Sequence, residues 1–379
     1  MVFGKLYSKE QKDKVKCALI EHNFYHQETL PTFAYLLNKL GIKVDVYTSR
    51  EGIKNNVFYY CSNLRYSLKR SDKLTFKLSA KIKKYKDYDF IIINSLEPKS
   101  IMFEASKLHI PTLAVVHNAN LLIEDHEYIS FFSTANRIPI VLAKHIVSYL
   151  NKQIKASWIA PLYLGSFKNI TTRRPIFCVQ GNLEYSRRNY DSLIESVESL
   201  LSDGIDHFIV MLIGRNNTLD GTVFKKKIHK RNLSRHILLS DKNLSYRDYF
   251  NMIKKAQFIL PLLDRTSEKY NPYFSYKITS SISIALGSSL IPIVHKDLAK
   301  LYEIEDSSFI YNDGELYKAM KKAIYSDKET LNSKRRHLKK LRENMLNISQ
   351  KNLKISLSEL GLIEIYPNQI NVSQDKNGI

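Results

Sequence analysis

Cysteine, tryptophan and long apolar runs are scarce in this chain. Of its 379 residues only three are cysteine and one is tryptophan. Cys17, Cys61 and Cys178 lack metal-ligand spacing, which excludes a cysteine-based metal motif and indicates a reducing compartment. No apolar run approaches the roughly 18 residues that a membrane span needs, and the first residues contain no signal-peptide core. We therefore expect a cytoplasmic protein, or one attached to the inner face of a membrane.

Acidic residues are also few relative to basic ones. The chain holds 58 Lys and Arg against 37 Asp and Glu, a formal net charge of +21. This excess predicts attraction to a polyanion: nucleic acid, anionic lipid or phosphorylated small molecules. Hydrophobic residues make up 44% of the chain, an ordinary balance for a soluble globular protein, and the length suits two domains.

Both halves of the chain alternate short apolar runs with amphipathic stretches, which is typical of parallel sheets wrapped by helices. In the first half we expect strands over 15–22, 43–48, 88–95, 110–118 and 138–150, and a helix over 29–41. In the second half we expect strands over 175–181, 207–214, 236–241, 256–263 and 289–295, and helices over 190–201 and 246–256. The predicted fold is α/β, with two doubly wound Rossmann-like domains facing each other across a cleft.

The polar, poorly patterned stretch 165–175 is the predicted linker between the domains. It places an N-terminal domain at 1–165 and a C-terminal domain at 175–350. Residues 351–379 are then a helix and tail, which we expect to cross back to the first domain.

The stretch "SYKITSSISIALGSSLIPIV" (275–294) has polar residues directly before an apolar helical pattern. Ser280 and Ser281 are the predicted N-caps, and Gly287 with Ser288 and Ser289 is the predicted end of the helix. One interpretation is an ordinary capped helix. The other is an anion site, in which the first-turn amides, the hydroxyls and Lys277 hold a phosphate.

Two predicted strands in the second half end in glycine and are followed by polar or basic residues. Gly181 precedes Arg187 and Arg188, and Gly214 precedes Arg215 and Asn216. Glycine permits close approach of the backbone, and arginine can bind phosphate oxygens through two parallel hydrogen bonds. Solvated surface arginines are the alternative. Because the carboxyl ends of parallel strands meet at one edge, the three features together predict a phosphate site.

The order strand–Gly–loop–Arg–helix, then strand–Gly, then 277–293 resembles the donor-binding domain of GT-B glycosyltransferases. It is similar to the family 4, group 1 type that makes bacterial polysaccharides. The resemblance implies a hexosyltransferase with a nucleotide-diphosphate-sugar donor and a glycan or lipid-linked acceptor, acting in the synthesis of cell-surface polysaccharide such as lipopolysaccharide. The donor-binding residues it implies are Gly181, Arg187, Arg188, Gly214, Asn216, Lys277, Thr279, Ser280 and Ser281.

One departure from the family 4 pattern stands out. That family carries two glutamates eight positions apart on this element, and here those places hold Tyr276 or Lys277 and Ile284 or Ala285. The start of this helix instead resembles a branch with small hydroxyl residues.

Two strand ends of the first domain carry polar residues that we expect to face the cleft. His117 and Asn118 follow one strand, and Asn23, His26 and Glu28 follow the first strand. An imidazole there can accept a proton from an acceptor hydroxyl, although a lone histidine is more often structural. We predict catalytic roles for His117 and His26, with His117 also matching the family's first-domain histidine. Asn23, Glu28 and Asn118 are the predicted acceptor-binding residues.

No metal or cofactor is expected. Arg188 and Lys277 would stabilise the leaving diphosphate in place of a metal ion. The acidic pair Asp87 and Asp89 opens a first-domain strand, at the end away from the cleft, so it is poorly placed to hold a metal-bound diphosphate.

Residues 54–86 contain ten Lys or Arg interleaved with aromatic and apolar residues. We predict that this segment binds the anionic membrane surface, and the alternative is a solvated helix face. Two other functions stay open. A different GT-B enzyme acting on sugar nucleotides, such as an epimerase, would share the fold. A basic nucleic-acid-binding protein would explain the charge, but no zinc finger or other recognisable motif supports it.

Overall fold

The computed structural model describes residues 15–23, 25–61, 63–71, 84–165, 174–240 and 244–364. Most of the predicted linker, part of the basic segment 54–86 and the end of the predicted tail lie outside the described residues. In the described part, no helix combines the length and apolar character that crossing a membrane would require.

The first sheet lies in the N-terminal half, and all its strands are parallel. Its strand order is β3-β2-β1-β4-β5-β6-β7. The strands are β1 (Lys16–Glu21), β2 (Lys43–Thr48), β3 (Ser67–Arg70), β4 (Phe90–Ile93), β5 (Thr112–Val115), β6 (Arg137–Val141) and β7 (Ser157–Trp158). The helices around it are α1 (Leu30–Lys39), α2 (Arg50–Asn55), α4 (Lys99–Ser106), α5 (Leu121–Glu124), α6 (His126–Phe132) and α7 (Lys144–Leu150), with short 3-10 helices η1 (Gln27–Thr29), η2 (Val57–Tyr60) and η3 (Lys84–Asp87).

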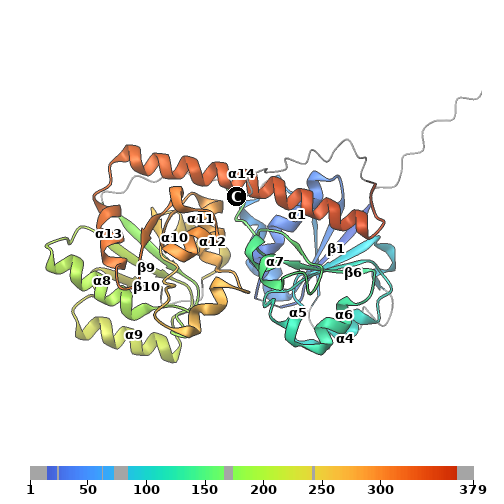
Figure 1. Ribbon diagram of the computed structural model, residues 1–379, viewed down its shortest axis with the longest axis horizontal. Helices are drawn as coiled ribbons and strands as arrows, with labels where there is room; N and C mark the ends of the chain where they lie inside the picture. Colours follow the sequence, from blue (N-terminus) through green and yellow to red (C-terminus); the bar gives the residue numbers. More distant parts are fainter. Residues whose placement is uncertain are drawn as a thin grey trace, which may run out of the picture.

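The second sheet is also parallel, with the order β10-β9-β8-β11-β12-β13. Its strands are β8 (Ile176–Gln180), β9 (Ile209–Ile213), β10 (Ile237–Leu239), β11 (Phe258–Ile259), β12 (Ile291–His295) and β13 (Phe309–Tyr311). Its helices are α8 (Tyr190–Ser202), α9 (Leu219–Lys230), α10 (Tyr246–Ile253), α11 (Ser280–Ser288), α12 (Lys296–Leu301), α13 (Leu316–Ile324) and α14 (Lys328–Glu359), with η4 (Glu268–Phe274) and η5 (Glu305–Ser307). In both sheets the first strand of the domain lies between the second and the fourth: β1 between β2 and β4, and β8 between β9 and β11. The predicted architecture of two doubly wound domains is confirmed (Figure 1).

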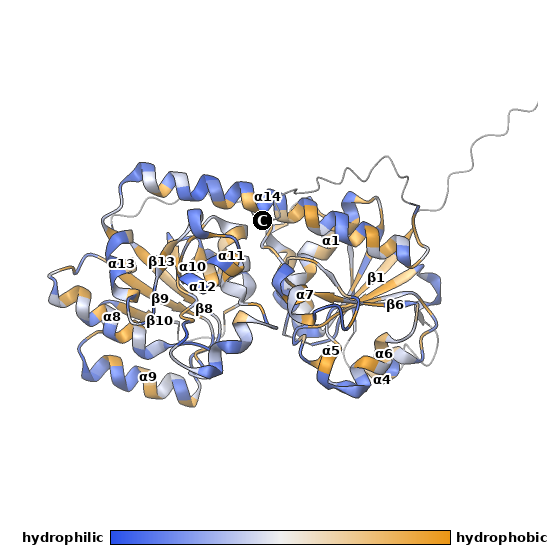
Figure 2. Ribbon diagram, in the orientation of Figure 1, coloured by the Kyte–Doolittle hydropathy of each residue, from blue (hydrophilic) through white to orange (hydrophobic). Residues whose placement is uncertain are grey.

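The cores follow from the near-continuous apolar runs of the inner strands, which are buried on both faces, whereas the edge strands β3 and β7 are only partly buried. Figure 2 shows the strands as the most hydrophobic elements and much of the outer helical surface as hydrophilic. Two helical or irregular segments had been predicted as strand. The run 138–150 is β6 followed by α7, because Ile146 and Leu150 lie four positions apart and bury one helical face. The run 256–263 leaves the ladder after Ile259, and Leu262 takes a left-handed φ of 55°.

The helix α11 differs from its prediction at its start. Its N-cap is Thr279, without a side-chain cap, so Ser280 and Ser281 are the first helical residues and not caps. Their hydroxyls instead accept hydrogen bonds from the Gln180 amide, at 2.6 and 3.2 Å. The helix ends within the predicted residues 287–289, where Ser289 adopts a φ of 57°. Gly287 is needed for packing, since a Cβ there would lie 2.3 Å from the carbonyl oxygen of Tyr163.

The two domains contact each other directly and through α14. The Tyr60 hydroxyl of η2 donates to the carbonyl of Arg247 at 2.7 Å, and the Ala119 amide donates to the carbonyl of Tyr276 at 3.2 Å. Helix α14 begins at Lys328, so residues 351–359 are the end of a long helix that lies along both domains (Figure 1). It contacts α11 in the second domain and α1 and β7 in the first. The domain boundaries proposed from the sequence stay predictions.

Candidate functional site

A cavity of about 500 Å³ lies between the domains, at the carboxyl ends of both sheets. Its volume is ordinary for a small-molecule site. Nine of the residues predicted from the sequence line it: His26, Glu28, His117, Asn118, Arg187, Arg188, Lys277, Thr279 and Ser280. The structure therefore brings together the predicted donor side and the predicted acceptor side.

Arg188 is the most informative residue of the second-domain side. Its side chain is buried, with 8% of the residue exposed, and its Nε has no hydrogen-bond partner. The guanidinium contacts Tyr190, and Nη1 lies 3.5 Å from the carbonyl oxygen of Asn182. Among the described residues, no carboxylate forms an ion pair with it. Burying a cation without a counter-ion costs roughly several kcal/mol of desolvation free energy. An anionic ligand bound to Arg188 would compensate this cost.

The neighbouring Arg187 differs from Arg188 in both exposure and pairing. Its Nε forms an ion pair of 2.6 Å with Glu184, and 57% of its side chain is exposed. Because Arg187 already has a carboxylate partner, Arg188 is the better candidate for binding an anion. Gly181 has a φ of 98°, and a Cβ there would lie 3.1 Å from Nη2 of Arg188. The glycine thus leaves room for the guanidinium.

Lys277 and the start of α11 complete this side of the cavity. The Lys277 amide donates to the carbonyl of Pro272 at 2.8 Å, which fixes the backbone of the segment before α11. Among the described residues, Lys277 makes no ion pair, and its ammonium lies 5.9 Å from the centre of the Tyr276 ring. Thr279, Ser280 and Ser283 line the cavity at the first turn of α11, where free amides and the helix dipole favour an anion.

Five predicted site residues are not among those that line the cavity: Asn23, Gly181, Gly214, Asn216 and Ser281. Asn23 donates to the carbonyl of Glu97 at 2.7 Å, and Ser281 is fully buried beside Gln180. Gly214 approaches the neighbouring strand so closely that a Cβ would lie 2.4 Å from the Gly181 oxygen. Asn216 is buried and donates to the carbonyl of Ser240. In this structure these groups support the loops at the strand ends.

The first-domain side of the cavity contains a stacked pair of histidines. The rings of His26 and His117 lie 3.7 Å apart and nearly parallel. His117 Nε2 lies 2.7 Å from the carbonyl oxygen of Asn94. Since a carbonyl only accepts, Nε2 carries the proton and Nδ1 is the basic nitrogen. Burial, together with the nearby His26, lowers the pKa of His117 well below its usual value, so the ring stays neutral at physiological pH.

Asn94 and Glu21 lie behind this histidine pair and had not been predicted from the sequence. The Asn94 amide donates to Glu21 at 2.6 Å and to the carbonyl of His26 at 3.0 Å. Its side-chain oxygen accepts from Thr29 at 2.5 Å. Burial raises the pKa of Glu21 to about 8, although hydrogen bonds from Asn94 and Asn23 oppose the shift. Asn94 therefore connects a buried carboxyl group to both histidines.

Other residues that line the cavity also went unpredicted: Thr29, Glu97, Ser186, Lys269, Tyr273 and Ser283. Some carried a sequence signal. Ser283 lies three positions after Ser280 and thus on the same helical face. Glu97 follows β4 just as His117 follows β5, so the rule that selected His117 also applies to Glu97. Lys269 and Tyr273 lie on η4, which the sequence pattern did not reveal.

Comparison with solved structures finds proteins with a similar fold. A glycosyltransferase from Rickettsia africae is similar over 92% of this chain and 99% of its own, with a TM-score of 0.59 and 13% identity. Anabaena HepE, solved with UDP and glucose, is similar over 91% of this chain and 99% of its own (TM-score 0.62, 10% identity). S. aureus MnaA, solved with UDP, is similar over 93% of this chain and 99% of its own (TM-score 0.58, 12% identity). At this identity the likeness shows the fold, and the chain has the GT-B fold.

No protein-family model matches the sequence, and no curated protein sequence matches it either.

Proposed function

We propose that this protein is a glycosyltransferase, which transfers a sugar from a nucleotide-diphosphate donor to a hydroxyl group of a glycan or a lipid-linked acceptor. The observation that carries the proposal is the buried, unpaired Arg188 at the cavity, close to the first turn of α11 and to Lys277. Two cations and a helix N-terminus form a site for a diphosphate. Two of the similar structures were solved with UDP, one of them also with glucose, which supports a UDP-hexose as donor.

In the proposed reaction the acceptor oxygen attacks the anomeric carbon of the donor sugar. The bond from that carbon to the diphosphate breaks, and the diphosphate leaves with the electron pair. Arg188, Lys277 and the α11 amides stabilise the charge that grows on it, so no metal ion is required. Nδ1 of His117, which the hydrogen bond from Nε2 to Asn94 leaves unprotonated, accepts the hydroxyl proton. Glu28 and Asn118, on the same side of the cavity, bind the acceptor.

The setting we propose is the synthesis of cell-surface polysaccharide, by a group 1 type of enzyme on the cytoplasmic face of the membrane. The net charge of +21 supports contact with anionic lipid. The described residues of the basic segment 54–86 do not form one continuous helix. They belong to parts of α2, η2, β3 and η3. Exposed Lys54, Arg65 and Lys86 support this contact, whereas Lys69 is paired with Asp45 at 2.5 Å.

A thermal-shift screen of UDP-sugars, with and without a chelator, tests the proposal. A bound donor stabilises only the folded state and raises Tm by mass action. We expect at least one UDP-hexose to raise Tm equally in the presence of the chelator, and to be consumed when acceptor glycans are supplied. If no nucleotide-sugar raises Tm at millimolar concentration, the proposed donor site is wrong.

A further inference from the structure

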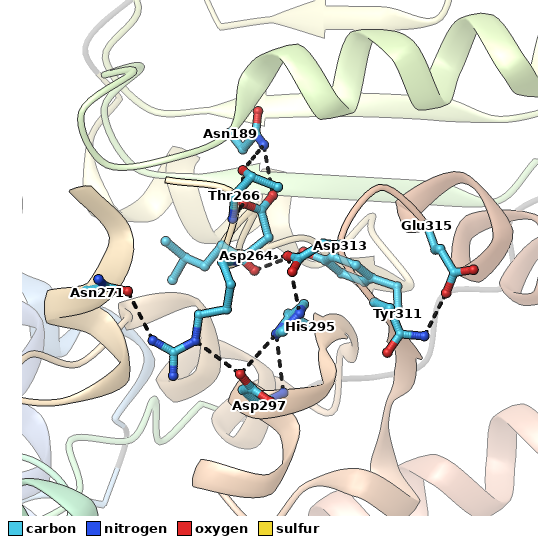
Figure 3. A network of polar contacts seen from close by, with 12 residues as sticks. Asn189, Asp264, Thr266, Asn271, His295, Asp297, Tyr311, Asp313 and Glu315 are labelled. Atoms are coloured by element: carbon cyan, nitrogen blue, oxygen red, sulfur yellow. Dashed lines mark hydrogen bonds and ion pairs between the residues drawn. The ribbon is translucent and has the colours of Figure 1, made fainter. Parts of the chain in front are cut away.

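A buried carboxylate lies directly behind the loop that carries Arg188. Asp264 follows β11 and is only 3% exposed. Its Oδ2 accepts from the Asn189 amide at 2.8 Å, and its Oδ1 accepts from the Thr266 amide nitrogen at 3.1 Å and the Thr266 hydroxyl at 2.5 Å (Figure 3). Among the described residues it forms no ion pair. Its two oxygens are instead occupied by neutral donors.

Asn189 is the residue after Arg188, and its backbone N–H and both of its side-chain polar atoms form hydrogen bonds. Its backbone N–H donates to the carbonyl of Leu262 at 2.8 Å. Its side-chain nitrogen donates to Asp264 and, at 3.3 Å, to Thr266. Its side-chain oxygen accepts from the Ser192 amide at 3.1 Å and so caps α8. Asn189 therefore joins the loop of Arg188 to α8 and to the segment after β11.

The segment after β11 is itself anchored on its other side. The Arg265 amide donates to Asp313 at 2.9 Å, and the Arg265 guanidinium donates to Asp297 at 3.0 Å and to Asn271 at 3.1 Å (Figure 3). The guanidinium also covers the Phe274 ring at 4.0 Å. These bonds reach residues that follow β12 and β13, and also η4. Asp264 is thus held in a rigid frame and can act as a fixed point for Asn189.

We propose that Asp264 and Asn189 are positioning residues for Arg188, which set the direction of its guanidinium toward the donor diphosphate. This inference rests on the proposed function. The side chain of Arg188 makes few bonds of its own, and the hydrogen bond to the Asn182 carbonyl is long. Its orientation therefore depends on the backbone, which Asn189 holds from the next position. A loose backbone would have to be ordered when the diphosphate binds, and affinity would fall.

Three variants test the pair: Asp264→Asn, Asn189→Asp and the double exchange. Each single change leaves two donors or two carboxylates face to face. The double exchange restores one donor and one acceptor, because the carboxylate then at position 189 can accept from the amide at position 264 and still cap α8. We expect calorimetric titration with UDP to show a loss of about tenfold in affinity for each single variant, and recovery of most of it in the exchange.

Asp327→Ala is the matched control. Asp327 caps α14 by accepting from the Thr330 amide at 2.7 Å and does not line the cavity. This variant should lower Tm and leave the affinity for UDP unchanged. If the single variants at 264 and 189 behave like this control, or the exchange restores Tm without restoring affinity, the pair only packs the loop and the inference is wrong. Should the single variants fail to fold, Thr266→Val is a milder change, because it removes one hydrogen bond to Asp264 and one to Asn189. We expect it to lower the affinity for UDP by about threefold. Unchanged affinity in that variant also overturns the inference.

Failure of the proposed function gives a different result. If the wild-type protein does not bind UDP or any other nucleoside diphosphate, the donor site and this inference fall together. If the wild type binds and Arg188→Ala loses affinity while the variants at 264 and 189 keep it, the donor site stands and only the positioning role is lost.

Discussion

The two sides of the cleft are built alike but hold opposite chemistry. In each sheet the site residues follow neighbouring inner strands, β1, β4 and β5 in the first domain and β8 and β11 in the second. In each, a buried carboxyl group accepts from an asparagine, Glu21 from Asn94 and Asp264 from Asn189. The asparagine then supports the functional group: a stacked histidine pair in the first domain, an arginine without an ion-pair partner among the described residues in the second.

This difference assigns the tasks in the proposed reaction. The second domain supplies fixed positive charge, which suits a diphosphate that stays anionic throughout the reaction. The first domain supplies a base that is kept neutral by burial and a neighbouring imidazole, which suits proton transfer. Either side alone is incomplete, so activity requires both domains at one cavity.

The largest effect should come from removing the proposed base. We expect His117→Ala to lower kcat by about 100-fold or more, in the range of general-base catalysis. The affinity for UDP, measured by calorimetry, should stay near the wild-type value because His117 lies on the other domain. A collapse of UDP affinity in a folded variant would make His117 a donor ligand and end the division between the two sides.

The next effect compares two adjacent arginines. We expect Arg188→Ala to lower the affinity for UDP by about 10- to 100-fold, since a charge-assisted hydrogen bond contributes roughly 1.5–3 kcal/mol. Tm should fall little, because the change also removes an uncompensated buried charge. Arg187→Ala is the matched control and should have the smaller effect, as its side chain is exposed and paired with Glu184. Equal losses in both variants would contradict the assignment to Arg188.

A smaller effect concerns Glu21 and pH. The pKa of this carboxyl rises from 4.5 to about 8 on folding. Between these values the folded protein binds more protons than the unfolded chain, so the free energy of unfolding falls as pH rises. Glutamine resembles the protonated acid. We therefore expect the Tm of Glu21→Gln to fall less than the Tm of the wild type when the pH rises from 5 to 9. The exposed Glu97→Gln should follow the wild type. Parallel curves for Glu21→Gln and wild type would show that Glu21 is already ionised at neutral pH.

The smallest effect per residue concerns the membrane. If the first domain docks on anionic lipid, each nearby basic residue contributes roughly 1 kcal/mol. Reversing the charge of Lys81, Lys83, Lys84 and Lys86 to glutamate should then abolish co-sedimentation with anionic vesicles at low salt. The matched control reverses four basic residues of the second domain, Lys225, Lys226, Lys230 and Arg235, and should retain binding. Equal behaviour of the two sets would mean that net charge, and not a first-domain surface, causes the binding.

The parts of the fold that repeat along the chain could be predicted from the sequence. Alternating apolar runs and helices predicted the two parallel sheets, because burial on both faces leaves a pattern in each strand. The strand-end rule placed His26, His117, Arg187 and Arg188 at the cavity, since the carboxyl ends of parallel strands share one edge. The local sequence pattern failed for 138–150 and for the start of α11, where packing against neighbours decided which residues belong to a helix.

The sequence by itself determined the two-domain order, the excess of positive charge and the set of strand ends from which a site could be built. The tertiary structure alone decided which members of that set act together. Arg187 and Arg188 are the same residue type at adjacent positions, yet one is exposed and paired and the other is buried and unpaired. Asn189 and Asp264 are 75 positions apart, and Asn94 and Glu21 are 73 apart. Burial and pairing at that separation arise only when distant strands pack side by side, and such contacts leave no local pattern in the chain.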